Sequence, residues 1–387
     1  MIYLDHAAAT PTSNKAKKAM EPYFADQFFN PSAPYISANH VRQDYEEAKD
    51  EIAHAIGAKG ADLVMTSGAT ESINLAFNIL EPDAEVLISA VEHKSVVEAA
   101  KKFNCKTINV DKFGRILIDD FKKKLSNKTQ FVSVCLASGE LGTIQPISEI
   151  AAVIKEEVLR RKLAGETTPL YFHCDASQGI GILEAKVGRL GVDLLTINSA
   201  KVYGPKGVGA LYVGHNVKLK PMTVGGGQEM GLRSGTENVP GVIGFAAAIK
   251  DAEEHLNAER KRLEKLKTIL KNELKDISGI MFLGNPKYQL ANFLPISIPG
   301  VDAERIIFAL ENEEVYLSTG AACSASKGIK SATLTAIGLD DASIAGSLRI
   351  TMGKLNDEEN IKKAGELIKS AITSEQSRNW QTSSTIL

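Results

Sequence analysis

The run Thr196-Ile-Asn-Ser-Ala-Lys-Val-Tyr-Gly-Pro-Lys-Gly207 places Lys201 just past an apolar segment that has the composition of a buried strand. A second apolar segment, residues 170–174, ends at Asp175. The carboxyl ends of neighbouring parallel strands meet at one edge of a sheet, so we expect both residues to face one site. A lysine amine can form a Schiff base there, and a carboxylate can keep a pyridine nitrogen protonated. Pyridoxal phosphate (PLP) requires this pair of groups. Asp175 could instead only cap a helix, but its partnership with Lys201 favours the cofactor.

Short segments rich in Val and Ile alternate with helical patterns from about residue 60 to residue 215. Strands are expected at 63–66, 85–89, 106–110, 130–136, 170–174, 193–198 and 209–213, and helices at 71–79, 95–102 and 147–163. Alternation of this kind predicts an α/β fold in which helices sandwich a mostly parallel, seven-stranded sheet.

The C-terminal third of the chain has a different pattern. A charged helix is expected at 249–275, where Leu256, Leu263, Leu266 and Leu270 form an apolar stripe. Beyond it we expect strands at 292–298, 315–318 and 347–351, and helices at 303–312 and 357–372. The pattern predicts a large domain over 15–250 and a small α+β domain formed by 1–14 and 251–387. Residues 373–387, rich in Ser, Thr and Gln, are expected to be mobile.

The bulk composition excludes several classes of protein. The 387 residues carry a net charge of −2, which gives no electrostatic case for binding nucleic acid or an anionic membrane. No apolar run reaches the roughly 18 residues of a membrane span. The N-terminus lacks the basic start and apolar stretch of a signal peptide, so a cytoplasmic location is expected.

The four cysteines do not form a C-x-x-C pair, so we expect neither a metal site nor a disulfide framework. Cys105, Cys135 and Cys174 lie in apolar, strand-like runs and are expected to be core residues. Cys323 differs, because it lies in Ser318-Thr-Gly-Ala-Ala-Cys-Ser-Ala-Ser-Lys-Gly328, a run of small residues typical of a loop.

Ser67-Gly-Ala-Thr-Glu71 follows one predicted strand and opens a helix. Backbone amides at Ala69 and Thr70, with the Thr70 hydroxyl, could bind a phosphate there. Taken alone, the run could equally be an ordinary helix cap. A binding role becomes the better interpretation beside Lys201 and Asp175.

Four further segments have both a functional and a plain structural interpretation. His93 follows a strand and could lie against a pyridine ring, or simply be a hydrogen-bonded strand-end histidine. Gln178 could donate to the cofactor's ring oxygen or cap the next helix. Arg349 could bind a substrate carboxylate in a bidentate fork or form a surface ion pair. The glycine-rich run 225–238, with Arg233 and Thr236, could contact an anionic ligand or be a flexible loop.

Taken together, the motifs resemble the class V aminotransferase family, and within it the cysteine desulfurases of the housekeeping iron–sulfur assembly type. The matching runs cover nearly the whole chain in the family's order: residues 3–11, 30–32, 66–72, 92–94, 142–147, 173–178, 203–212, 233–238, 320–324 and 347–349.

The resemblance implies a PLP-dependent enzyme of fold type I that works as a homodimer. It implies that L-cysteine is converted to L-alanine, that Lys201 holds the cofactor and moves protons, and that Cys323 as a thiolate keeps the sulfur as a persulfide. Cys323 lies eleven positions before Leu334, which resembles the subgroup with a long catalytic loop. The resemblance also implies roles for other residues. His93 would act in catalysis and bind the cofactor, and Arg349 and Asn30 would bind the substrate. The remaining cofactor-binding residues would be Ala69, Thr70, Asp175, Gln178, Asn198 and Thr236, with Thr236 reaching the phosphate of the neighbouring subunit.

The chain departs from the family pattern around the cofactor. Relatives usually have histidine where Ala200 stands and serine at Asn198, and both contact the phosphate. They carry two asparagines where this chain has Ser138 and Gly139, before the glutamate matched by Glu140. Each lost hydrogen bond to a charged group would weaken cofactor binding by about 1.5–3 kcal/mol, although Asn198 could restore one. We therefore expect a working cofactor site that binds PLP more weakly.

Two other functions stay open. A selenocysteine lyase or a carbon–sulfur lyase would use the same cofactor, although a lyase that releases sulfide has no need of Cys323. A paralogue without activity could serve as a scaffold or regulator of sulfur transfer, which only the altered 138–139 and 198–200 positions support. The expected partner is a sulfur acceptor, either an iron–sulfur scaffold or a tRNA thiolation enzyme, which the sequence does not identify.

Overall fold

The computed structural model describes residues 1–320 and 330–384. Its larger unit is built on a seven-stranded sheet with the order β2-β8-β7-β6-β5-β3-β4. Only β8 runs antiparallel to its neighbours in this sheet. The mostly parallel seven-stranded sheet predicted from the sequence is therefore confirmed. The strands are β2 (Leu63–Thr66), β3 (Glu85–Ser89), β4 (Asn104–Ile108), β5 (Thr129–Cys135), β6 (Tyr171–Asp175), β7 (Leu194–Asn198) and β8 (Gly209–Val213).

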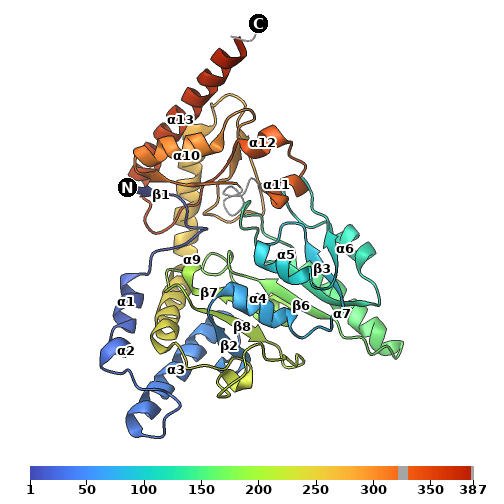
Figure 1. The fold of residues 1–387 in the computed structure, drawn as a ribbon. Helices are drawn as coiled ribbons and strands as arrows, with labels where there is room; N and C mark the ends of the chain where they lie inside the picture. The colour runs from blue at the N-terminus through green and yellow to red at the C-terminus, as the bar shows by residue number, and fades with distance from the viewer. Residues whose placement is uncertain (321–329, 385–387) are drawn as a thin grey trace.

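Helices cover both faces of this sheet (Figure 1). Along β2, Leu63 and Met65 belong to one core with α3, α7 and the first half of α9, whereas Val64 packs in a second core with α4 and α5. Strands buried on two faces read as continuous apolar runs, which is why the sequence revealed them. The helices are α1 (Asn14–Met20), α2 (Pro22–Ala25), α3 (Ile36–Ala55), α4 (Ala69–Phe77), α5 (Lys94–Ala100), α6 (Ile118–Lys124), α7 (Ile147–Leu163), α8 (Val187–Leu190) and α9 (Val239–Leu274), with short 3-10 turns at η1 (Gly60–Asp62), η2 (Ser199–Lys201) and η3 (Glu229–Gly231).

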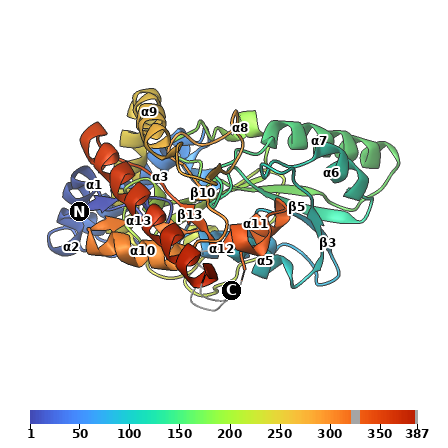
Figure 2. The same cartoon turned by 90° about the horizontal axis from the view of Figure 1, so that it is seen from above.

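The smaller unit has its own core, to which the N-terminal residues Ile2 and Leu4 contribute. β1 (Ile2–Tyr3) pairs in parallel with β11 (Val315–Tyr316), and an antiparallel sheet has the order β12-β13-β10-β9. Figures 1 and 2 show α10 and α13 side by side on this unit. Its elements are β9 (Met281–Phe282), β10 (Ile296–Ser297), β12 (Ser318–Thr319), β13 (Ser347–Arg349), α10 (Ala303–Asn312), α11 (Ala332–Ala336), α12 (Asp341–Ala345) and α13 (Glu358–Ser384).

The 36-residue helix α9 spans both units. Phe245 and Ile249 in its first half pack in the core of the large unit, whereas Leu266 and Leu270 pack in the core of the small one. The helix begins ten residues earlier than the sequence predicted. Asn238 caps it by accepting a hydrogen bond from Gly241 N at 3.1 Å. The domain boundary that we propose near residue 250 thus falls inside a continuous helix.

The expectation of a mobile tail is wrong for residues 373–384, because α13 continues to Ser384, and residues 385–387 lie outside the described part of the chain. Its polar side chains find partners on the small unit. Glu375 is buried and lies 3.4 Å from Arg305 Nη1, and Gln376 Nε2 donates to Ser278 O at 2.8 Å. The end of α13 projects beyond the rest of the molecule in Figure 1.

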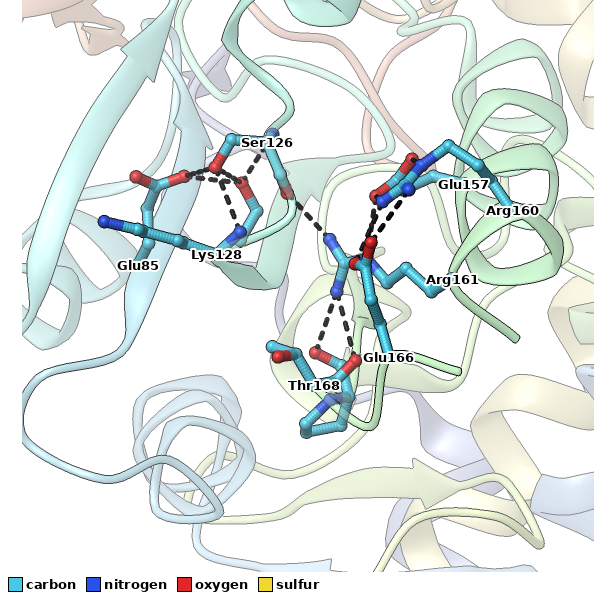
Figure 3. A network of polar contacts seen from close by, with 10 residues as sticks. Glu85, Ser126, Lys128, Glu157, Arg160, Arg161, Glu166 and Thr168 are labelled. Carbon is cyan, nitrogen blue, oxygen red and sulfur yellow. Dashed lines mark hydrogen bonds and ion pairs between the residues drawn. The ribbon is translucent and has the colours of Figure 1, made fainter. Parts of the chain in front are cut away.

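A polar network closes the edge of the large sheet where β3, β5 and β6 begin (Figure 3). The buried Arg161 donates to the carbonyl oxygens of Ser126 at 2.8 Å and Thr168 at 3.2 Å. Glu85 accepts from the Ser126 hydroxyl at 2.7 Å and the Thr129 hydroxyl at 2.6 Å. Because this edge is filled by structural contacts, the opposite, carboxyl edge is the one left for a ligand. Among the described helices, none combines the length and apolar character needed to span a membrane.

Candidate active site at the carboxyl edge of the sheet

Lys201 and Asp175 lie at the ends of adjacent parallel strands, as the sequence predicted. Asp175 is the last residue of β6, and β7 leads directly into the turn η2 that ends at Lys201. The Asp175 carboxylate is buried, and its Oδ1 accepts from Ser177 N at 3.0 Å and Ser177 Oγ at 2.6 Å. Those two hydrogen bonds fix the orientation of the carboxylate.

His93 shares this site with three charged residues. The pKa of His93 is lowered, and burial is the largest cause. The Asp175 carboxylate opposes this shift, whereas the positive charges of Lys201 and Arg349 add to it. All three charges are thus close enough to perturb one imidazole. The residue nevertheless keeps exposed surface, so a ligand can reach it. The lowered pKa keeps the imidazole neutral near pH 7, where it can accept a proton.

The structure confirms the structural interpretation of His93, as a hydrogen-bonded histidine after a strand. Its Nδ1 caps α5, accepting from Ser95 N at 3.2 Å and lying 2.7 Å from Ser95 Oγ. The cap fixes the ring at the end of the β3 connection and does not remove it from the site.

The N-terminal segment 5–9 lies across Lys201, a contact that the sequence did not indicate. Lys201 Nζ donates to Ala7 O at 2.6 Å and to Ala8 O at 2.8 Å. Gln178 Nε2 donates to Ala7 O at 3.0 Å. Thr351 of the small unit holds the segment in place, because its Oγ1 accepts from Ala7 N at 2.9 Å. The segment therefore joins the lysine to the unit that carries Arg349.

The N-terminus of α4 presents Ala69 and Thr70 at the same edge of the sheet. Gly68 precedes them with a φ of 145°, a conformation open to glycine. Gly209 of β8 packs against it, since a Cβ at position 209 would lie 2.7 Å from the Gly68 Cα. Neither neighbour places a side chain over this helix end, so its backbone amides can approach a ligand closely.

Glu71 links this helix end to the glycine-rich loop. Its carboxylate accepts from Ser67 N at 2.6 Å and from Arg233 Nε at 2.9 Å. Burial alone would raise the pKa of Glu71, but the hydrogen bonds from Ser67 and Arg233 outweigh burial and lower it. Thr236, three residues beyond Arg233, is exposed.

The positions that depart from the family pattern also line this edge. Asn198 Oδ1 accepts from Ala200 N at 3.2 Å and so caps the turn that ends in Lys201. The Ser138 hydroxyl is buried and accepts from Leu141 N at 3.4 Å. A Cβ at Gly139 would lie 3.6 Å from Gln178 Cγ, which places position 139 beside the glutamine.

Arg349 is buried in β13, so the alternative of a surface ion pair is wrong. Its Nη2 donates to Asp5 Oδ1 at 2.8 Å and its Nη1 to Gly139 O at 3.3 Å. The small unit thereby brings a guanidinium to the edge of the large sheet, next to His93.

Asn30 is not brought to Arg349 within one chain. It is exposed, and its Oδ1 accepts from Ser32 N at 2.9 Å. The connection between α2 and α3, which carries it, lies at the lower end of Figure 1, away from the small unit.

Cys323 lies outside the described residues, but the positions on either side of its segment are close to the site. Gly320 N donates to Ser347 O at 2.9 Å, two residues before Arg349. Ser331 Oγ donates to Glu140 Oε2 at 2.5 Å, one residue after Gly139. Burial raises the pKa of Glu140, and its hydrogen bonds to Ser331 and Thr333 oppose that shift. Sequence reasoning missed this contact and the Arg233–Glu71 pair, because neither shows in local patterns.

Comparison with known proteins agrees with this geometry. The family model for aminotransferase class V matches residues 2–364. Cysteine desulfurase IscS 1 of Archaeoglobus fulgidus is 36% identical over 382 residues, covering 96% of this chain and 97% of the relative. A solved NifS-like protein superposes with a TM-score of 0.88 at 29% identity, covering 96% of this chain and 99% of its own. SspA in complex with cysteine superposes with a TM-score of 0.78 at 30% identity, covering 91% and 99%. The chain therefore belongs to the aminotransferase class V family, in its cysteine desulfurase branch.

Proposed function

We propose that this protein is a PLP-dependent cysteine desulfurase that converts L-cysteine to L-alanine and leaves the sulfur as a persulfide on Cys323. One observation carries the proposal: an amine, a fixed carboxylate, a neutral imidazole and a buried guanidinium share one edge of the sheet, from Lys201, Asp175, His93 and Arg349. The names of the relatives, and the cysteine bound to SspA, support the same substrate.

The groups at this edge fit PLP. The Lys201 amine would bind its aldehyde carbon, and the Asp175 carboxylate, oriented by Ser177, would pair with the pyridine nitrogen. Ala69 and Thr70, at the N-terminus of α4, would receive the phosphate. Gln178 and Asn198 lie beside Lys201 as further donors. When bound, the cofactor supplies an electron sink for the bonds at the substrate Cα.

The remaining steps belong to the residues of the chain. Arg349 binds and orients the substrate carboxylate. Lys201 would remove the Cα proton of the substrate and return it to Cα before alanine leaves, and neutral His93 can accept a proton nearby. The Cys323 thiolate attacks the substrate sulfur: an S–S bond forms, the Cβ–Sγ bond breaks, and its electron pair stays on carbon. Protonation of that carbon yields the methyl group of alanine.

A homodimer would complete the site. Thr236 and Asn30 are both exposed, and the segment around Asn30 exposes the large apolar side chains of Phe24, Phe28, Tyr35 and Ile36. Apolar groups of this size, gathered on one segment, are typical of an interface. In this proposal Thr236 binds the phosphate of the neighbouring subunit and Asn30 approaches its substrate. The persulfide then passes to an acceptor protein in the cytoplasm, an iron–sulfur scaffold or a tRNA thiolation enzyme, without direct contact with nucleic acid or membrane.

The test uses the purified full-length chain with added PLP and L-cysteine. We expect an absorbance band from the lysine-bound cofactor, equal production of alanine and persulfide, and loss of both the band and alanine in Lys201→Ala. Undiminished alanine production by Lys201→Ala would refute the proposal.

In Cys323→Ala we expect the band to remain and persulfide to disappear. Free sulfide with pyruvate and ammonia in place of alanine, from that variant, would instead indicate a carbon–sulfur lyase, and selenocysteine as the preferred substrate would indicate a selenocysteine lyase. Failure of the wild type to bind added PLP would indicate a scaffold.

A further inference from the structure

The contact between Asp5 and Arg349 joins opposite ends of the sequence inside the proposed substrate site. Asp5 Oδ1 lies 2.8 Å from Arg349 Nη2, although the two residues are 344 positions apart in the sequence. Both ends are held by backbone contacts of the small unit. Asp5 forms a parallel bridge with Thr351, and Tyr3 Oη donates to Asp5 O at 2.9 Å. The fold thus fixes the backbone at Asp5 and leaves its carboxylate free to rotate.

The Asp5 carboxylate makes the kind of contact that an amino-acid carboxylate would make. Arg349 Nη1 is already directed to Gly139 O, and the buried Nε has no hydrogen-bond partner among the described residues. Asp5 therefore supplies the negative charge that balances this guanidinium. A substrate carboxylate must share Arg349 with Asp5 or displace it.

Asp5 is the partner that can move. The side chain of Arg349 is 9% exposed and that of Asp5 is 19% exposed. Within the described part of the chain, Arg349 is the one hydrogen-bond partner of the Asp5 carboxylate. A carboxylate on a short side chain at the rim of the site can return to water at small cost, whereas moving the buried guanidinium would leave its charge without a partner.

We propose that Asp5 sets the affinity of the site for the substrate carboxylate by competing with it for Arg349. The inference rests on the proposed function and adds a residue to it. With Asp5 present, the charge of the Arg349 guanidinium is balanced by a carboxylate 2.8 Å away. Without it the site gains one positive charge, which attracts an anionic substrate group. Asp5 thus weakens substrate binding and favours release of the carboxylate product.

The test compares Asp5→Asn with the wild type as full-length holoenzyme. Asparagine keeps the shape of the side chain and can still accept from Arg349, but it carries no charge. We expect the KM for L-cysteine and the inhibition constant of L-alanine to fall about three- to tenfold, because a neutral acceptor holds a guanidinium less strongly than a charged one. Cysteamine, which lacks a carboxylate, should inhibit both proteins equally.

Two variants serve as controls. Asp5→Glu keeps the charge and should not lower the KM. Glu51→Gln removes a carboxylate from the exposed pair that Glu51 forms with Lys250 at 3.0 Å, and should leave the KM unchanged. If Asp5→Asn unfolds in a thermal melt, Asp5→Ser tests the same prediction. An unchanged or raised KM in the folded neutral variant, or an equal shift for cysteamine, would overturn the inference. A wild type that binds PLP and yields alanine separates this result from failure of the proposed function.

Discussion

Glu229 of the glycine-rich loop lies 3.2 Å from Lys49 Nζ of α3, and both side chains are only 5% exposed. The same carboxylate accepts from Tyr45 Oη at 2.6 Å and Met65 N at 2.8 Å. The backbone here is strained, because Glu229 has a φ of 48° and Met230 a φ of 60°. Buried contacts on Glu229 therefore hold a loop conformation that its backbone alone would not favour.

Replacing Lys49 by Met should leave the Glu229 carboxylate buried without its cation. Breaking one side of a buried pair typically costs about 3–5 kcal/mol, so the free energy of unfolding should fall by that order. Urea unfolding measures this loss of free energy. Both proteins are compared at the same concentration, because association of subunits also affects stability. Lys250→Met, which breaks the exposed pair with Glu51, should cost less than about 1 kcal/mol. Equal losses in the two variants would contradict the role given to Glu229.

Arg233 should strengthen PLP binding through Glu71. Its Nε lies 2.9 Å from Glu71 Oε1, in the first turn of α4. In Arg233→Ala the Glu71 carboxylate would repel the phosphate expected at Ala69 and Thr70. We expect the Kd for PLP to rise about three- to tenfold at low salt, and the difference to shrink as salt screens the charges. Absorbance titration of the cofactor-free protein measures this.

Arg42→Ala is the matched control, because exposed Arg42 donates to Asn39 at 2.9 Å on α3. It should leave the Kd for PLP unchanged. If Arg233→Ala binds PLP as tightly as this control, then Arg233 stabilises the glycine-rich loop but does not contribute to PLP affinity.

His173 should make the fold sensitive to acid. The ring is fully buried between Ser133 Oγ and Thr196 Oγ1, each at 2.9 Å, and burial lowers the pKa of His173 to about 4. In the unfolded chain a histidine has a pKa of about 6.5. Between these values the unfolded state binds the extra proton, so stability is full above about pH 6.5 and is lost as pH falls toward 4. The loss from pH 7.5 to pH 5 should be about 2 kcal/mol.

His173→Gln removes this contribution, so the variant should be less stable at pH 7.5 but lose less stability on acidification. Urea unfolding at the two pH values gives the comparison. His215→Gln, at a histidine whose side chain is 83% exposed, should keep the wild-type dependence. Parallel pH profiles for wild type and His173→Gln would show that His173 does not titrate as stated.

The fold was predictable where local sequence patterns set it. β2, β3, β8, α7 and α10 begin and end at the predicted residues, because doubly buried strands and striped helices have distinct patterns. The helix α3 was missed, since its buried face relies on small residues such as Ala38 and Ala48, which give little periodic contrast. Membership of the cysteine desulfurase branch was predicted from the motifs and is confirmed.

The site was predictable only in part, for a similar reason. Lys201 and Asp175 lie at the carboxyl ends of strand segments, and in a parallel sheet these ends lie together at the edge where ligands bind. The Asp5–Arg349 pair joins residues 344 apart, and no local pattern reports such a contact. Thr236 and Asn30 are exposed in a single chain, so their proposed roles depend on a second copy.

Gly139→Asn should restore a cofactor contact that the family pattern leads one to expect. A Cβ at this position would meet Gln178 Cγ at 3.6 Å, an ordinary van der Waals distance, and Gly139 is not among the glycines with positive φ. An asparagine side chain therefore fits beside the donor proposed for the ring oxygen. One added hydrogen bond of about 1 kcal/mol should lower the Kd for PLP roughly fivefold, measured by absorbance titration.

The neighbouring position supplies the control for this gain. Ser138 is fully buried, and its hydroxyl accepts from the backbone N–H groups of Glu140 and Leu141, both at 3.4 Å. Ser138→Asn would force a larger side chain into a packed turn, so it should lower stability without tightening PLP binding. If Gly139→Asn binds PLP no better than the wild type, then the glycine is not the cause of weaker binding, and the substitutions at Asn198 and Ala200 would have to account for it.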